Sequence, residues 1–233
     1  MVKLIIFEST DVLIDSTSAK GKSVSVVVDF LARNGITVTA RSCGLDLDKS
    51  KEYVAHAFGL DSSVHDFDRL TLGHLLEKHR VRLSVVDFES LLRAFHEAQV
   101  ENAKLHSDVA VTLSGVKGKA KLCLIAEGPS WKERKLVSKL GLSGLFSERF
   151  YSEEFGFNKS ADALFKHVLD VFDVVPSEVV LVTSNVDRDV ASANRFGICT
   201  VLVDRSGKVK LSSLAIRPKF LVRSLKEISK LPL

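Results

Sequence analysis

The chain divides into two parts that differ in the spacing of hydrophobic and polar residues. From about residue 18 to residue 106, apolar residues recur every three or four positions, which is typical of amphipathic helices. The clearest segments are SVVVDFLARNG (25–35), KEYVAHAFGL (51–60), RLTLGHLLEKHRV (69–81) and DFESLLRAFHEAQVENAKL (87–105). This part is predicted to be all-helical.

From about residue 121, short apolar runs alternate with amphipathic segments. The runs KLCLIA (121–126), EVVLVTS (178–184) and ICTVLVD (198–204) are rich in Val, Ile and Leu, and helical patterns such as SADALFKHVLDVFDV (160–174) lie between them. This alternation predicts a parallel sheet that is covered by helices on both faces. The first apolar run, Lys3 to Phe7, must join that sheet, because an isolated strand has no partner in a helical bundle.

We therefore predict an α/β fold, a doubly wound parallel-sheet core with an inserted all-helical cap. The core comprises residues 1–16 and 107–233, and the cap comprises residues 17–106. The cap should lie over the carboxyl ends of the strands.

Length and composition agree with a folded protein that is not embedded in a membrane. With 233 residues, of which 45% are hydrophobic, the chain can bury a substantial core. No apolar run approaches the length of a membrane span, and the start Met-Val-Lys runs directly into a strand without a signal-peptide pattern. We expect a cytoplasmic protein with no membrane partner.

Charge and cysteine content argue against a nucleic-acid-binding, a disulfide-rich or a zinc-binding protein. The net charge is +4, but the basic residues are spread out, with no run of five or more, so we expect no nucleic-acid partner. Cysteines at 43, 123 and 199 are too few for a disulfide framework or a zinc site and are read as structural thiols. The ligand or protein partner stays open, as does the choice between monomer and dimer.

Two acidic motifs in the helical part receive ordinary structural interpretations. HDFD at 65–68 follows a Ser-containing turn and is predicted to be a loop. GLDLDKS at 44–50 is predicted to be a helix start.

Polar residues follow the strands of the predicted core at four places. In an open parallel sheet the ligand site lies beyond the carboxyl ends of the strands. That rule brings together the loops at 8–12, 126–128, 158–160 and 183–189. From these loops, the candidate ligand-binding residues are Ala126, Glu127, Gly128 and Asn185.

The order of strands, the loop spacing and the inserted helical segment resemble the haloacid dehalogenase-like (HAD) hydrolase superfamily over essentially the whole chain. The run from GPSWKERKLVSKLGL to ALFKHVL (128–169) and the run DVASANRFGICTVLV (189–203) are the most similar stretches. The resemblance implies a nucleophilic aspartate, a general acid/base aspartate, a phosphoryl-binding hydroxyl, a lysine and acids that hold magnesium.

The positions implied by this resemblance depart from the family pattern. The two aspartates of the first motif fall on Glu8 and Thr10, followed by Asp11 and Val12 where the family has Gly-Thr. The hydroxyl position falls on Ala126 and the lysine on Lys159. The magnesium acids fall on Ser184, which is no acid, and on Asp189, which would be the remaining ligand.

Each departure removes part of the implied chemistry. Glu8 is longer than aspartate by one methylene, which moves the carboxylate when in-line attack tolerates little displacement. Thr10 cannot deliver a proton near neutral pH, and Ala126 lacks a hydroxyl donor. Ser184 removes an anionic ligand from a metal that is usually held by one or two carboxylates. We therefore expect no magnesium site, and a direct Glu8–Lys159 ion pair in its place.

Two functions follow as hypotheses. In the first, the chain is a HAD-like protein that has lost magnesium-dependent phosphohydrolase activity and acts as a noncatalytic binding or interaction protein without a cofactor. In the second, it is an active phosphatase with magnesium as cofactor, using Glu8 as a displaced nucleophile or other acids such as Asp11, Asp187 and Asp189.

Overall fold

A six-stranded sheet forms the core of the protein. The computed structural model describes residues 1–58, 67–155, 162–211 and 214–232. The sheet consists of β1 (Leu4–Glu8), β4 (Lys121–Ala126), β5 (Glu148–Tyr151), β6 (Val179–Thr183), β7 (Cys199–Val203) and β8 (Phe220–Val222). All neighbours are parallel, in the order β5-β4-β1-β6-β7-β8. The predicted α/β fold with a doubly wound parallel sheet is confirmed.

Helices cover both faces of this sheet, and the alternation of side chains along β1 shows why. Ile5 and Phe7 pack into a cluster with α5 (Val109–Val116), α6 (Ser130–Lys139) and η5 (Leu225–Lys230). Leu4 and Ile6 point to the opposite face, against α7 (Asp162–Phe172) and α8 (Ala191–Phe196). Because both faces are buried, the strand reads as a continuous apolar run.

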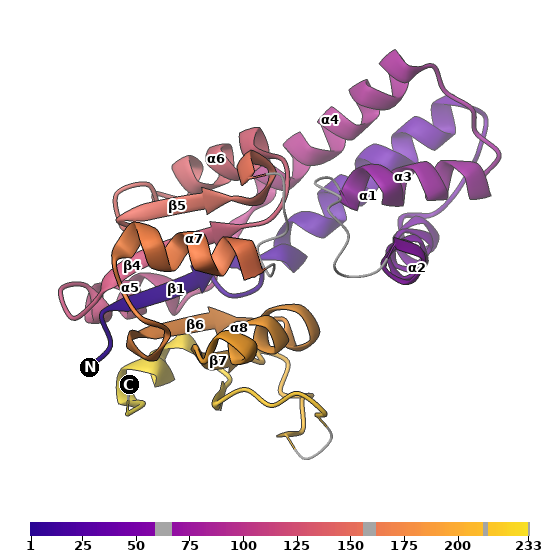
Figure 1. Ribbon diagram of the computed structural model, residues 1–233. Helices are drawn as coiled ribbons and strands as arrows, with labels where there is room; N and C mark the ends of the chain where they lie inside the picture. The colour runs from indigo at the N-terminus through magenta and orange to yellow at the C-terminus, as the bar shows by residue number, and fades with distance from the viewer. Residues whose placement is uncertain (59–66, 156–161, 212–213, 233) are drawn as a thin grey trace.

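Four helices form a separate group beside the sheet (Figure 1), which is the predicted helical cap: α1 (Ser16–Arg33), α2 (Ala40–Phe58), α3 (Phe67–Lys78) and α4 (Val85–Asn102). They share a core of their own, to which Val27, Leu47, Leu75 and Phe95 contribute one residue from each helix. Two short strands, β2 (Ile14–Asp15) and β3 (Lys104–Leu105), pair antiparallel where this group joins the core. The exact domain boundaries stay a prediction.

Two local predictions in the cap were wrong. The segment 44–50 lies inside α2, which begins at Ala40, so it is not a helix start. Phe67 and Asp68 form the first turn of α3, not a loop, while residues 65 and 66 lie outside the described residues. Asp68 in a first helical turn is favoured by the helix dipole.

Three short helical turns complete the elements: η1 (Ser152–Phe155), η2 (Pro176–Glu178) and η3 (Val186–Val190). Within the described residues, every helix is too short or too polar to cross a lipid bilayer. All three cysteines are free; Cys43 and Cys123 are buried and Cys199 is partly buried.

Asp108 fastens the C-terminal segment to the core. It is 5% exposed and accepts hydrogen bonds from Arg205 Nη1 and Nη2, each at 3.0 Å, from Ser224 Oγ at 2.7 Å and from the Leu225 N–H at 2.8 Å. Burial alone would raise the pKa of Asp108, but the bonds from Arg205, Ser224 and Leu225 outweigh it and lower the pKa to about 2. The carboxylate is therefore held in its charged form.

Candidate functional site

The carboxyl ends of β1, β4 and β6 open into one cavity between the core and the cap. Its volume is ≈ 830 Å³. Of the predicted site residues, it is lined by Glu8, Thr10, Glu127, Gly128, Ser184 and Asn185. Ala126 and Asp189 lie buried behind this lining. Lys159, and with it the predicted ion pair to Glu8, lies outside the described residues.

Glu8 closes the floor of the cavity at the end of β1. This residue is largely buried and only 8% exposed. The oxygen Oε2 lies 2.8 Å from Thr183 Oγ1, 3.2 Å from the Ser184 backbone nitrogen and 3.3 Å from Ser184 Oγ. This carboxylate oxygen is therefore already surrounded by hydrogen-bond donors of the protein.

The Thr183 hydroxyl lies between the two acids of the site. Its Oγ1 is 2.8 Å from Glu8 Oε2 and 2.5 Å from Asp189 Oδ2, and it also accepts a hydrogen bond from the Asn185 N–H at 3.0 Å. A hydroxyl carries one hydrogen, so it can donate to only one of these oxygens. The Thr183 hydroxyl therefore bridges the two carboxyl groups and donates its hydrogen to one of them at a time.

Ser184 takes a position where the family resemblance implies a magnesium acid. Its Oγ lies 3.3 Å from both Glu8 Oε2 and the backbone oxygen of Thr10. Ser184 thus offers a neutral hydroxyl where the resemblance implies an anionic ligand, and Mg²⁺ is usually held through one or two carboxylates. Across the described residues, no three Asp, Glu, His or Cys side chains form a group that could hold a metal ion. The described residues therefore present a weaker ligand set for magnesium than the family pattern implies.

The remaining polar residues of the loops are engaged with one another. Arg188 of η3 forms an ion pair with Glu127, which follows β4. The Asn185 side-chain oxygen accepts from the Arg188 N–H at 3.1 Å and so caps η3. Two of the predicted ligand-binding residues, Glu127 and Asn185, therefore also organise the loop after β6.

Ala126 and Gly128 act through their small size. Ala126 is fully buried and offers no polar side-chain group to the cavity. Gly128 has φ 133°, a conformation that side chains rarely adopt, and a Cβ there would lie 3.2 Å from Glu133 Oε1 and 3.5 Å from Lys132 Nζ. The glycine lets these two charged side chains of α6 approach the loop.

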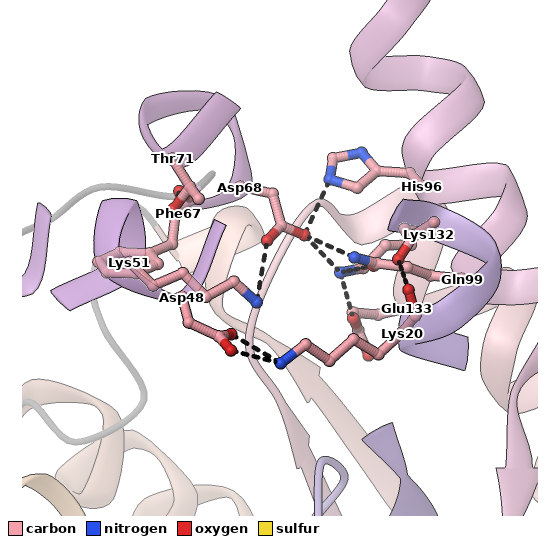
Figure 2. A network of polar contacts seen from close by, with 11 residues as sticks. Lys20, Asp48, Lys51, Phe67, Asp68, Thr71, His96, Gln99, Lys132 and Glu133 are labelled. Atoms are coloured by element: carbon pink, nitrogen blue, oxygen red, sulfur yellow. Dashed lines mark hydrogen bonds and ion pairs between the residues drawn. The ribbon is translucent and has the colours of Figure 1, made fainter. Parts of the chain in front are cut away.

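The cavity wall contains a polar network that joins the cap to the core (Figure 2). Asp68 Oδ2 lies 3.1 Å from Gln99 Nε2, 3.3 Å from His96 Nε2 and 3.8 Å from Lys132 Nζ, and Oδ1 lies 4.0 Å from Lys51 Nζ. Burial raises the pKa of Asp68, but the His96 hydrogen bond and the charges of Lys132 and Lys51 outweigh it and lower the pKa below its usual range. Asp68 thus links α2, α3 and α4 with α6.

Glu133 is a buried acid of the same wall. It is 1% exposed, and its Oε1 lies 3.5 Å from Lys132 Nζ. Its Oε2 has no hydrogen-bond partner among the described residues. Burial raises the pKa of the Glu133 carboxyl, against the opposing charge and hydrogen bond of Lys132.

Four residues of the site were not predicted individually from the sequence: Thr183, Arg188, Asp68 and Glu133. Thr183 and Arg188 fall in the predicted loop 183–189. Thr183 ends an apolar strand, and its hydroxyl was not separable from an ordinary strand end. Asp68 was assigned to a loop, and Glu133 is one of several charges on an amphipathic helix. Asp68 and Glu133 meet at Lys132 only when α3, α4 and α6 pack together.

Comparison with known proteins yields a consistent group of matches. A family model described as HAD-hydrolase-like matches residues 156–228. Glyceraldehyde 3-phosphate phosphatase of Methanopyrus kandleri is 28% identical over 215 residues, which cover 88% of this chain and 85% of that protein. N-acylneuraminate-9-phosphatase of Rattus norvegicus is 25% identical over 131 residues, which cover 56% of this chain and 52% of that protein, about half of its length.

A solved structure shares the fold across both parts of the chain. The putative HAD-hydrolase YfnB of Bacillus subtilis, bound to magnesium, has a TM-score of 0.82 at 17% identity, covering 98% of this chain and 97% of that chain. At this identity the likeness concerns the fold. The family model, the sequence matches and the strand order support the assignment of the chain to the haloacid dehalogenase-like (HAD) superfamily.

Proposed function

We propose that this HAD-like protein does not perform magnesium-dependent phosphoryl transfer and instead binds a ligand in the cavity between cap and core. The observation that carries the proposal is the position of the Ser184 hydroxyl, 3.3 Å from both Glu8 Oε2 and the Thr10 backbone oxygen. A hydrogen-bonding group stands where the family resemblance implies a metal-binding acid. The proposal places the protein in the cytoplasm, with a small molecule or another protein as partner.

The chemistry of Glu8 supports this proposal. A nucleophilic carboxylate must present an oxygen with a free lone pair in line with the bond that breaks. Glu8 Oε2 accepts hydrogen bonds from Thr183 and Ser184, which lower its nucleophilicity. Neither Thr10 nor Ala126 supplies the proton or the hydroxyl donor that the transferring group would need.

A second candidate is an active hydrolase, and one observation favours it. Relatives that align with this chain are named phosphatases, and one of them matches over 88% of the chain. Under this alternative, Glu8 attacks phosphorus and Asp189 is the surviving acid of the last motif.

A phosphatase assay separates the two candidates. With p-nitrophenyl phosphate or glyceraldehyde 3-phosphate and millimolar magnesium, we expect the parent chain and a Glu8→Gln variant to release phosphate at the same background rate. Magnesium-dependent turnover that disappears in Glu8→Gln, at an unchanged melting temperature, would show that Glu8 is a nucleophile and the chain an enzyme.

A positive control comes from restoring the family residues. The triple variant Glu8→Asp, Thr10→Asp, Ser184→Asp should gain magnesium binding by titration calorimetry before it gains turnover. Each single variant should do little, because residues that act as a unit are not additive. Tight magnesium binding by the unaltered chain would contradict the proposal independently of any activity.

A further inference from the structure

We propose that the cavity between cap and core binds an organic cation, an amine carried on an apolar body, and disfavours a phosphate ester. This inference rests on the proposed function, because a magnesium ion at Glu8 would change the charge of the site. It is carried by the charge of the cavity lining, by the pairing of its cations and by one buried acid.

The lining carries an excess of acids. Among the described residues, eight carboxyl side chains line the cavity: Glu8, Asp11, Asp15, Asp48, Glu52, Asp68, Glu127 and Glu133. Four cationic side chains line it: Lys20, Lys51, Lys132 and Arg188. A cleft with one sign of charge concentrates ligands of the opposite sign.

The cations of the lining are already paired with acids of the same wall. Lys20 Nζ lies 2.7 Å from Asp48, and Arg188 forms its ion pair with Glu127. Lys51 and Lys132 both face Asp68, at 4.0 and 3.8 Å. A phosphate ester would have to displace these carboxylates before it could contact a cation, whereas an ammonium group finds acids in surplus.

Glu133 is the acid that the ammonium group of such a ligand would contact. The residue is 1% exposed and lines the cavity, yet its Oε2 has no hydrogen-bond partner among the described residues. A buried acceptor without a donor is costly. A ligand ammonium supplies both a donor and a positive charge, and three N–H groups can reach Glu133 and its neighbours.

Apolar residues of the same lining suit the body of the ligand. Val24 of α1, Leu47 of α2, Phe95 of α4 and Leu136 of α6 come from different helices around the cavity. Ligand sites in proteins combine such apolar walls with a few convergent polar groups. An amine on an aromatic or aliphatic body matches this combination.

The test uses three probes with one benzyl body and different charges: benzylamine, benzyl alcohol and benzyl phosphate. In titrations of the full chain without magnesium, we expect benzylamine to bind at least tenfold more tightly than benzyl alcohol, and benzyl phosphate more weakly than either. Benzyl phosphate binding more tightly than benzylamine would overturn the inference, and so would equal affinity for all three.

Variants test whether Glu133 causes the preference for benzylamine over benzyl alcohol. Glu133→Gln should weaken benzylamine at least tenfold and leave benzyl alcohol within about twofold, while Glu101→Gln, an exposed change outside the lining, should alter neither. Unchanged benzylamine binding in folded Glu133→Gln would contradict the assignment. If Glu133→Gln does not fold, the probe series on the parent chain still decides.

The same probes keep this inference apart from the proposed function. Benzyl phosphate that is hydrolysed only with magnesium would refute the proposed function. Benzyl phosphate that binds well and is never hydrolysed would refute only the preference for amines.

Discussion

Replacing Asp108 by alanine is expected to lower the free energy of unfolding by about 3–5 kcal/mol. The carboxylate is buried and faces the guanidinium of Arg205 through two 3.0 Å contacts. Its removal leaves that cation without compensation and also frees the Ser224 hydroxyl and the Leu225 N–H. Urea unfolding followed by circular dichroism measures the loss.

The pH dependence of this effect has a definite sign. The pKa of Asp108 is lowered to about 2 in the folded chain, against about 3.9 in an unfolded chain. Its stabilisation is therefore fully present above about pH 4 and is lost as the pH falls towards 2. Parent and variant should converge in stability over that window.

An exposed aspartate provides the matched control for Asp108. Asp170→Ala on α7 changes an exposed side chain, so it should alter the free energy of unfolding by less than about 0.5 kcal/mol. A loss for Asp108→Ala no larger than that of Asp170→Ala would mean that the C-terminal segment does not depend on this contact.

Replacing Asp68 by alanine is expected to cost about 3 kcal/mol, because Lys132, whose side chain is only 11% exposed, loses one of its two acidic neighbours. Asp68 also accepts from Gln99, so both the cap helix α4 and the core helix α6 lose a partner. Because its pKa is lowered below the usual range, this stabilisation is present above the unfolded pKa of about 3.9 and is lost as the pH falls.

Asp48→Ala, in the same cavity, is the control for Asp68. Asp48 pairs with Lys20, and both side chains are about half exposed, at 45% and 49%. Such a pair contributes about 0–1 kcal/mol. Equal losses for Asp48→Ala and Asp68→Ala in denaturant titrations at pH 7 would show that the network of Figure 2 is solvated and does not join cap to core.

Much of the fold was predictable because its buried strands are runs of consecutive apolar residues, which are visible in the sequence. The strand runs 122–126 and 179–182 are apolar without interruption, since both faces of the sheet are covered, and they match β4 and β6 closely. The interior of α2 was mistaken for a helix start because Asp46 and Asp48 resemble capping residues. Their actual partners, Lys78 and Lys20, lie on other helices.

The only part of the candidate site that was predictable from the sequence is the part formed by residues at the ends of strands. Glu8, Glu127 and Ser184 lie at the ends of neighbouring parallel strands, so topology alone brings them together. The role of Thr183 depends on a rotamer that places one hydroxyl between two acids. The role of Asp68 depends on how the cap packs against α6, and no local pattern encodes that packing.

The place of β1 in the sheet affects how the chain acquires its structure during synthesis. Leu4 pairs with Lys121 on one side and with Val179 on the other, so β1, which is made before the five other strands of the sheet, completes its hydrogen bonds only after β6 is made. The helices α1 to α4 share a core of their own that does not need β6, so they can form meanwhile. Until β6 is made, an apolar strand with open edges is exposed to other chains. Pulse-labelled hydrogen exchange should therefore find the amides of α1 and α4 protected before those of β1.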